Sequence, residues 1–279
     1  MYQTRGRLPR AYVVLGEEEQ PPRRTWPLVT YTIIIVNIIS YVFGHIRLVT
    51  YELLKTDFGL IPSQIMSGQN LYTLITSMFI HASFYDAGFW GLILFGFHML
   101  FLWLFGDDAE NVFGHSLFLA LYLFSGVIGG LFHSALSVLV LSPATDIPMI
   151  GASGAVFGVM SAYAFFFPRR RLRLFFIFRY YRWRRYRYRP YDRNRHVIPL
   201  GLPAYVFIAS AVAIEAILSL ALFSAGTFYT DIYHLLAGML AIGGFIGGAI
   251  FALFFKAAGR GPWRGDGEPS NNHQNYEEE

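Results

Sequence analysis

The chain alternates between long apolar runs and short polar or basic connections. Six runs have the length of a helix that crosses a membrane, namely 27–43, 88–105, 116–141, 152–167, 201–223 and 232–255. Crossing about 30 Å of hydrocarbon takes roughly 20 helical residues at about 1.5 Å each. The pattern therefore predicts an all-α, polytopic membrane protein built as a bundle of six transmembrane helices.

Composition supports a membrane protein. Of the 279 residues, 54% are hydrophobic and only 14% are charged, where soluble domains average about 25% charged residues. The chain has no cysteine, which excludes disulfides, thiol catalysis and cysteine metal sites. No ATP motif or metal-binding constellation occurs, so we expect no cofactor.

The basic residues predict the orientation. We divide the chain into an N-terminal segment 1–26, a membrane domain 27–256 and a disordered tail 257–279. Five arginines lie in the first part, and twelve lie in a basic connection, 168–198, inside the membrane domain. Because arginine and lysine favour the cytoplasmic side, we expect both termini in the cytoplasm and the protein in the plasma membrane.

The basic connection interleaves arginine with aromatic residues, as in "RYYRWRRYRYRPYDRNRH". Some nucleic-acid binders share this pattern. Beside a membrane, however, it is typical of arginines that face anionic headgroups and of aromatic rings that anchor at the interface. We favour membrane lipids as the partner and expect no nucleic acid.

One serine lies between glycines at the head of the fourth run, in "PMIGASGAVFGVMSAYAFFFP". If this helix ends at the cytoplasmic face near Pro168, Ser153 lies about 22 Å away, below the outer surface. Gly151 and Gly154 permit close approach of a backbone. The free N–H groups of a helix start could also stabilise an oxyanion.

A serine nucleophile needs a base, usually a histidine. His98, His133 and His234 lie within apolar runs. Because runs four and six both begin at the outer side in the predicted topology, Ser153 and His234 should approach the same depth. The alternative is packing alone, with the small residues closing the helices together and Ser153 bonded to a backbone carbonyl.

Several motifs in order resemble the rhomboid family of intramembrane serine proteases. They are "FGLIPSQIMSGQNLYTLITSMFIHASF", "MLFLWLFGDDAENVFGH", the serine motif and the histidine of the last run, and the similarity covers about 29–255. It implies a serine–histidine dyad of Ser153 and His234, with the Ser153 N–H in the oxyanion hole. It also implies single-span transmembrane proteins as substrates, with helix-breaking residues near the cut and a small residue before it.

The resemblance assigns roles to further residues. Glu110 and Gly114 match a structural motif in the loop after the second run. Phe157 stands where many relatives have a tyrosine that stacks on the catalytic histidine.

The chain departs from the family in the second run, where rhomboids carry a histidine and an asparagine aimed at the oxyanion. Alignment from the end of the run places Leu94 and His98 there, whereas alignment from His81 places Asp86 and Trp90 there. We favour the first, so His98 is either an oxyanion donor or a packing residue. Unless the helix extends beyond residue 105, His98 lies only about 10 Å above the inner face, which argues against the donor role.

Two functions remain open. The first is an intramembrane serine protease, favoured by the presence of both Ser153 and His234. The second is a catalytically inactive rhomboid-like protein that binds transmembrane segments, favoured by the altered second run. Glu215, a carboxyl group inside the fifth run, is a further functional candidate because charge is costly there, or it is protonated or hydrogen-bonded within the bundle.

Overall fold

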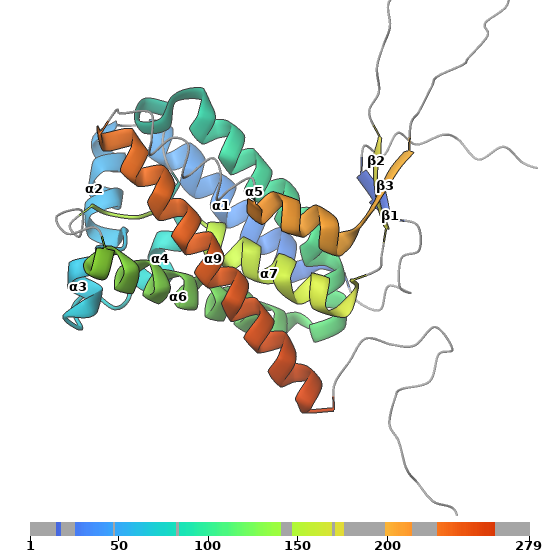
Figure 1. Cartoon of the computed structure of the whole chain (residues 1–279). Helices are drawn as coiled ribbons and strands as arrows, with labels where there is room; N and C mark the ends of the chain where they lie inside the picture. Colours follow the sequence, from blue (N-terminus) through green and yellow to red (C-terminus); the bar gives the residue numbers. More distant parts are fainter. Residues whose placement is uncertain are drawn as a thin grey trace, which may run out of the picture.

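The computed structural model of the chain describes residues 15–17, 26–46, 48–81, 84–140, 147–168, 171–175, 199–213 and 228–259. Over these residues the protein is predominantly helical, as predicted (Figure 1). The main helices are α1 (Leu28–Ile46), α5 (Phe84–Phe113), α6 (His115–Val140), α7 (Ser153–Phe166), a helix over Ala204–Ala213, and α9 (Phe228–Ala257).

Each predicted span contains a described helix. Three segments are long and apolar enough to cross a membrane, and they are Gly91–Phe113, His115–Leu139 and Gly238–Ala257. The other three predicted spans contain shorter apolar helices, Leu28–Gly44, Ser153–Phe166 and Ala204–Ala213. Large hydrophobic side chains are exposed on the outside of the bundle, such as Ile39, Leu139 and Phe254, as expected of a surface that faces lipid.

α7 is the central helix of the bundle. Every residue from Ser153 to Tyr163 is buried, and α5, α6 and α9 pack around it. A helix that is apolar on all sides is stable only when it is buried on all sides. Its first residue therefore lies inside protein.

α5 is longer than predicted. The predicted span ended at residue 105, but the helix continues to Phe113. One of these acidic residues, Glu110, lies within the helix rather than in a loop and is fully buried. Gly114 follows the helix with a φ of 75°, a conformation that glycine adopts at little cost.

The Glu110 carboxylate binds the start of α1. It accepts hydrogen bonds from the N–H of Val29 (2.9 Å), the N–H of Thr30 (2.8 Å) and the Thr30 hydroxyl (2.7 Å). Nδ1 of His115 donates to the same carboxylate. The first amides of a helix lack partners within the helix and favour negative charge. Their hydrogen bonds to the carboxylate account for the burial of Glu110 and for the position at which α1 begins.

The connection between α1 and α5 is folded rather than extended. It contains α2 (Leu48–Phe58), α3 (Pro62–Met66), α4 (Thr73–Thr76) and the 3₁₀ helix η1 (Ser77–Phe79). A small second core is formed by Leu60, Ile65, Leu74 and Met149. Leu60 and Met149 also exchange two backbone hydrogen bonds, of 2.8 and 2.7 Å. The connection thereby holds the segment that enters α7.

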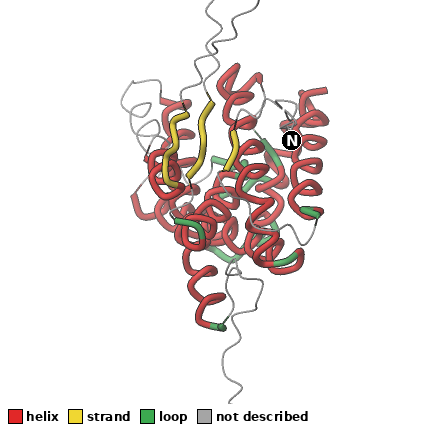
Figure 2. The backbone as a smooth tube through the Cα atoms, turned by 90° about the vertical axis from the view of Figure 1, so that its right-hand side faces the viewer, coloured by secondary structure: helices red, strands yellow, loops and turns green. Residues whose placement is uncertain are grey.

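Three short strands form a sheet that the sequence did not predict. They are β1 (Leu15–Glu17), β2 (Arg171–Phe175) and β3 (Pro199–Pro203), antiparallel in the order β1-β2-β3. The expectation of an all-α chain therefore holds for the bundle and is wrong for this small element. Figure 2 looks onto the end of the molecule where the three strands lie side by side.

Candidate active site

Ser153 is the first residue of α7 and is 4% exposed. The preceding residue, Ala152, has φ −84° and ψ 4° and provides no side-chain cap. The amides of the first turn therefore have no capping oxygen, and their partial positive charge remains available to an anion. The catalytic role and the back-bonded packing role of Ser153 both stay predictions.

The segment before Ser153 has a fixed backbone. Gly151 has a φ of 125°, which an L-residue rarely adopts, and its N–H donates to the carbonyl of Ser77 at 2.9 Å. Together with the Leu60–Met149 pair, this bond ties the entry of α7 to η1. A glycine at position 151 is thus required by conformation.

α7 and α9 approach each other at glycines, as the small-residue spacing predicted. A Cβ atom added to Gly244 would lie 1.9 Å from the carbonyl oxygen of Gly154. One added to Gly248 would lie 2.0 Å from the carbonyl oxygen of Gly158. Gly243 and Gly247 of the same helix face α6 instead. Because both contacts advance by four residues in the same direction, the two helices run parallel.

His234 lies in the second turn of α9, and its side chain is outside the described residues. It precedes Gly248 by nearly four full turns, which places it on the side of α9 that faces α7. If both helices were straight and parallel, the glycine contacts would fix their relative level. The Cα atom of His234 would then lie about 13 Å farther along the helix axis than that of Ser153, toward the start of α9. The helices cross at an angle (Figure 1). A shared depth for Ser153 and His234 stays a prediction.

His98 lies deeper than the sequence indicated, because α5 extends to Phe113. The Phe113 and Phe166 rings are 5.4 Å apart, and counting back along both helices puts His98 about 22 Å, and Ser153 about 20 Å, from this contact. The Phe105 and Tyr163 rings are also in contact, at 4.9 Å. Measured along the helices from this contact, His98 lies about 10 Å away and Ser153 about 15 Å away. His98 and Ser153 therefore share a level within about 5 Å.

His98 also lies on the correct side of α5. It continues the stripe of Leu102, Phe105, Ala109 and Phe113, which are buried in the core that contains α7. The depth argument against His98 is therefore wrong. Leu94, one turn earlier on the same stripe, offers no donor.

His81 is a residue that sequence reasoning used only to align the chain. It is 6% exposed, its ring meets the edge of Phe95 at 4.8 Å, and neither ring nitrogen has a hydrogen-bond partner among the described residues. Burial, together with the charge of nearby His98, lowers the pKa of His81 from 6.5 to about 3. The His81 imidazole is therefore neutral near pH 7, and its pKa is coupled to that of His98.

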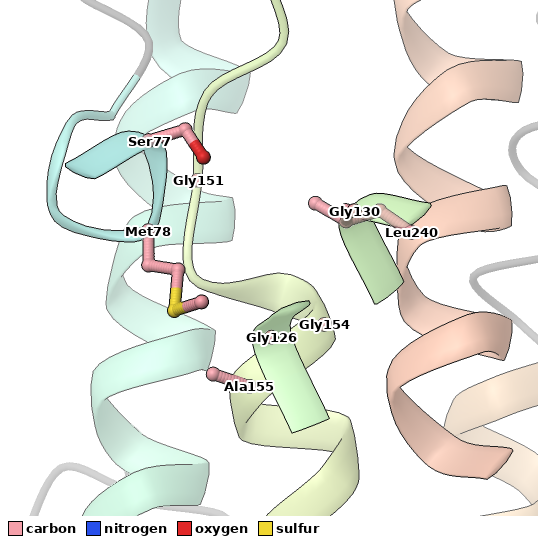
Figure 3. A pocket seen from close by; sticks show the side chains of 8 residues that line it. All are labelled: Ser77, Met78, Gly126, Gly130, Gly151, Gly154, Ala155 and Leu240. Carbon is pink, nitrogen blue, oxygen red and sulfur yellow. The ribbon is translucent and has the colours of Figure 1, made fainter. Parts of the chain in front are cut away.

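A small cavity, with room for about one water molecule, lies at the start of α7 (Figure 3). Figure 3 shows the Met78 side chain extending from η1 toward Ala155. The cavity is lined by Ser77, Met78, Gly126, Gly130, Gly151, Gly154, Ala155 and Leu240. Its lining includes Gly151 and Gly154, which lie on either side of Ser153 in the sequence.

The remaining predicted residues have defined places. Phe157, one turn after Ser153, is 2% exposed and belongs to the main core. Glu215 lies outside the described residues. Among the residues that the structure describes, no cluster of three or more metal-ligating side chains occurs. What the described site offers is a buried hydroxyl, free helix-start amides and an imidazole at about the same depth.

Comparison with known proteins gives a consistent result. The family model described as the rhomboid domain matches residues 68–258. "Rhomboid protein 1, mitochondrial" of Saccharomyces cerevisiae is 34% identical over 125 residues, 45% of this chain. "Rhomboid protease GluP" of Bacillus subtilis is 28% identical over 134 residues, 44% of this chain. The matches span only 31% and 23% of the length of these two relatives.

Proposed function

Because this chain belongs to the rhomboid family, we propose that it is an intramembrane serine protease with a dyad of Ser153 and His234. The observation that carries the proposal is the place of Ser153, buried at the uncapped start of α7 with a cavity beside it. A packing serine has no need of unpaired amides or of an adjacent cavity.

In the proposed mechanism, the Ser153 hydroxyl attacks the carbonyl carbon of the scissile peptide bond while His234 accepts its proton. The oxyanion is stabilised by the Ser153 N–H and by an N–H of His98, the imidazole at nearly the same depth. His234 then gives the proton to the leaving amine, and water hydrolyses the acyl enzyme with His234 as base. Each of these proton transfers requires the first turns of α9 to bring His234 to Ser153.

The proposed substrates are single-span membrane proteins. A peptide bond inside a helix is shielded by the helix's own hydrogen bonds, so the segment must unwind near the cut. The family resemblance implies helix-breaking residues near the cut and a small residue before it. We place the site in a six-span protein of the plasma membrane, open to the outer side, with both termini cytoplasmic.

A serine-directed fluorophosphonate probe tests the nucleophile. Wild type in detergent should be labelled, whereas Ser153→Ala and His234→Ala should not. Full labelling of Ser153→Ala would move the nucleophile elsewhere. The inactive, segment-binding alternative is favoured by Leu94, which lacks the donor expected there, and it predicts that wild type is not labelled either.

A further inference from the structure

The three-stranded sheet joins the basic connection to the N-terminal segment and sorts their residues onto two faces. Directly paired residues of an antiparallel sheet lie on the same face. One face holds Leu15, Glu17, Leu172, Leu174, Leu200 and Leu202. The other holds Gly16, Arg171, Arg173, Phe175, Gly201 and the two prolines of β3. The sheet is therefore amphipathic, with its two arginines on the same face.

The central position of the arginine face is paired with glycine on both sides. Arg173 pairs with Gly16 in β1 and with Gly201 in β3. Neither of these paired residues has a side chain, so the register places glycine on both sides of position 173.

The chain holds this face at the end of the bundle. β2 begins five residues after the last residue of α7, and β3 ends directly before the helix over Ala204–Ala213. The N–H of Tyr205 donates to the carbonyl of Pro168 at 3.4 Å, which joins the two helix ends. Arg171 thus lies within about 17 Å of the end of α7, since each residue spans at most about 3.5 Å.

This distance fits the polar layer of a bilayer, and the charge fits anionic lipid. The headgroup layer begins where the apolar helices end. Basic residues near that surface attract anionic headgroups, and arginine can bind a phosphate with two parallel hydrogen bonds. Ten further arginines of the same connection strengthen the local positive potential.

We propose that the arginine face of this sheet is a binding site for anionic phospholipid headgroups, organised by β1 and β3 around Arg173. The site depends on the sheet and not only on the number of charges in the connection. It is also independent of the proposed proteolysis, because neither Ser153 nor His234 takes part in it.

Native mass spectrometry of the full chain in detergent tests this site, with phosphatidylglycerol and phosphatidylcholine as the probes. Wild type should bind phosphatidylglycerol more tightly. The double variant Arg171→Gln/Arg173→Gln should lose roughly 10- to 30-fold of that affinity. The matched control Arg193→Gln/Arg195→Gln removes the same charge, at the same spacing, from the same connection, and should lose less than about threefold.

A second pair of variants tests the register without removing an arginine. Gly201→Glu places a carboxylate next to Arg173 across the strand pair and should weaken phosphatidylglycerol binding about fivefold. Asn194→Glu adds the same charge to the connection outside the sheet and should change it less than twofold. Thermal unfolding and fluorophosphonate labelling check that each variant is folded.

Three results would overturn the proposal. Equal losses in the two double variants would mean that the connection acts as an unstructured basic tract. Equal binding of the two lipids by wild type would remove the specificity for anionic lipid. Tight binding of a labelled oligonucleotide that depends on Arg171 and Arg173, without a lipid preference, would assign the face to nucleic acid.

Discussion

The two ends of α7 are held by different kinds of contact. At its last turns, aromatic rings fill the space, with Phe166 against Phe113 and Phe255 at centroid distances of 5.4 and 6.0 Å. At its first turns, backbones meet directly at Gly154 and Gly244. Aromatic side chains can shift and repack, whereas the main-chain atoms of a helix cannot move without moving the helix. The serine end should therefore tolerate change far less than the aromatic end.

The largest effect is expected for Gly244→Ala. The added Cβ would lie 1.9 Å from the carbonyl oxygen of Gly154, so α7 and α9 must separate, at a cost of about 3 kcal/mol or more. We expect loss of fluorophosphonate labelling and a lower unfolding temperature in detergent.

The matched control for Gly244→Ala is Gly96→Ala in α5, where nothing lies within 4 Å of the added atom. This variant should be neutral or stabilised by up to about 1 kcal/mol. If both alanine variants were equally stable, the close helix contact at the serine end would not exist.

His98 sharpens the comparison, because it would contribute to the reaction at the serine end without taking part in the contact between α7 and α9. Removal of one oxyanion donor typically lowers the rate about 10²- to 10³-fold, or about 3–4 kcal/mol in barrier. We expect this loss in the cleavage rate of His98→Ala, with little change in unfolding temperature. His98→Asn retains a donor and should recover part of the rate. A fully active His98→Ala would make His98 a packing residue.

A change at Glu110 tests the end of the bundle opposite the serine. There, a loss of stability should leave the chemistry of Ser153 unchanged. Glu110→Gln removes the charge that binds the start of α1 and should cost about 3 kcal/mol of unfolding free energy. The molecules that remain folded should still be labelled at Ser153.

The control for Glu110 is Glu52→Gln, which breaks an exposed pair with Lys55 at 3.1 Å. Such pairs contribute little, so we expect no measurable shift in unfolding temperature. A loss of labelling in folded Glu110→Gln would show that the two ends of the bundle are coupled.

The smallest effect is expected for Phe166→Leu at the aromatic end. A change between hydrophobic side chains that can repack usually costs less than about 1.5 kcal/mol. The unfolding temperature in detergent should fall slightly and labelling should persist. A loss as large as that of Gly244→Ala would contradict the difference between the two ends of α7.

The sequence predicted the serine end of the bundle better than its other parts. The start of α7 and the α7–α9 contact follow from local signals, a serine between glycines and small residues at four-residue spacing. The end of α5 did not follow from local signals, because the partner that keeps Glu110 in a helix is the start of α1, 80 residues away. The error carried over to the depth of His98.

The sheet and His81 were missed for a related reason. β1 and β2 pair residues that are more than 150 positions apart, Leu15 with Leu174, and neither strand has an alternating pattern long enough to stand out beside apolar helices. His81 lies in a connection whose folding depends on contacts with α6 and on the segment before α7. The hydrophobic periodicity of one segment does not reveal its contacts with distant segments.

The absence of native cysteine permits a direct test of the central claim that His234 meets Ser153. In Ser153→Cys/His234→Cys, a short thiol crosslinker should join the two positions. Trypsin then cuts the arginine-rich connection between them, and the fragments should remain together on a gel until the crosslink is reduced. Phe166→Cys/Phe255→Cys, whose native rings lie 6.0 Å apart, is the positive control. Separation of the 153/234 fragments while the control fragments stay joined would contradict the dyad.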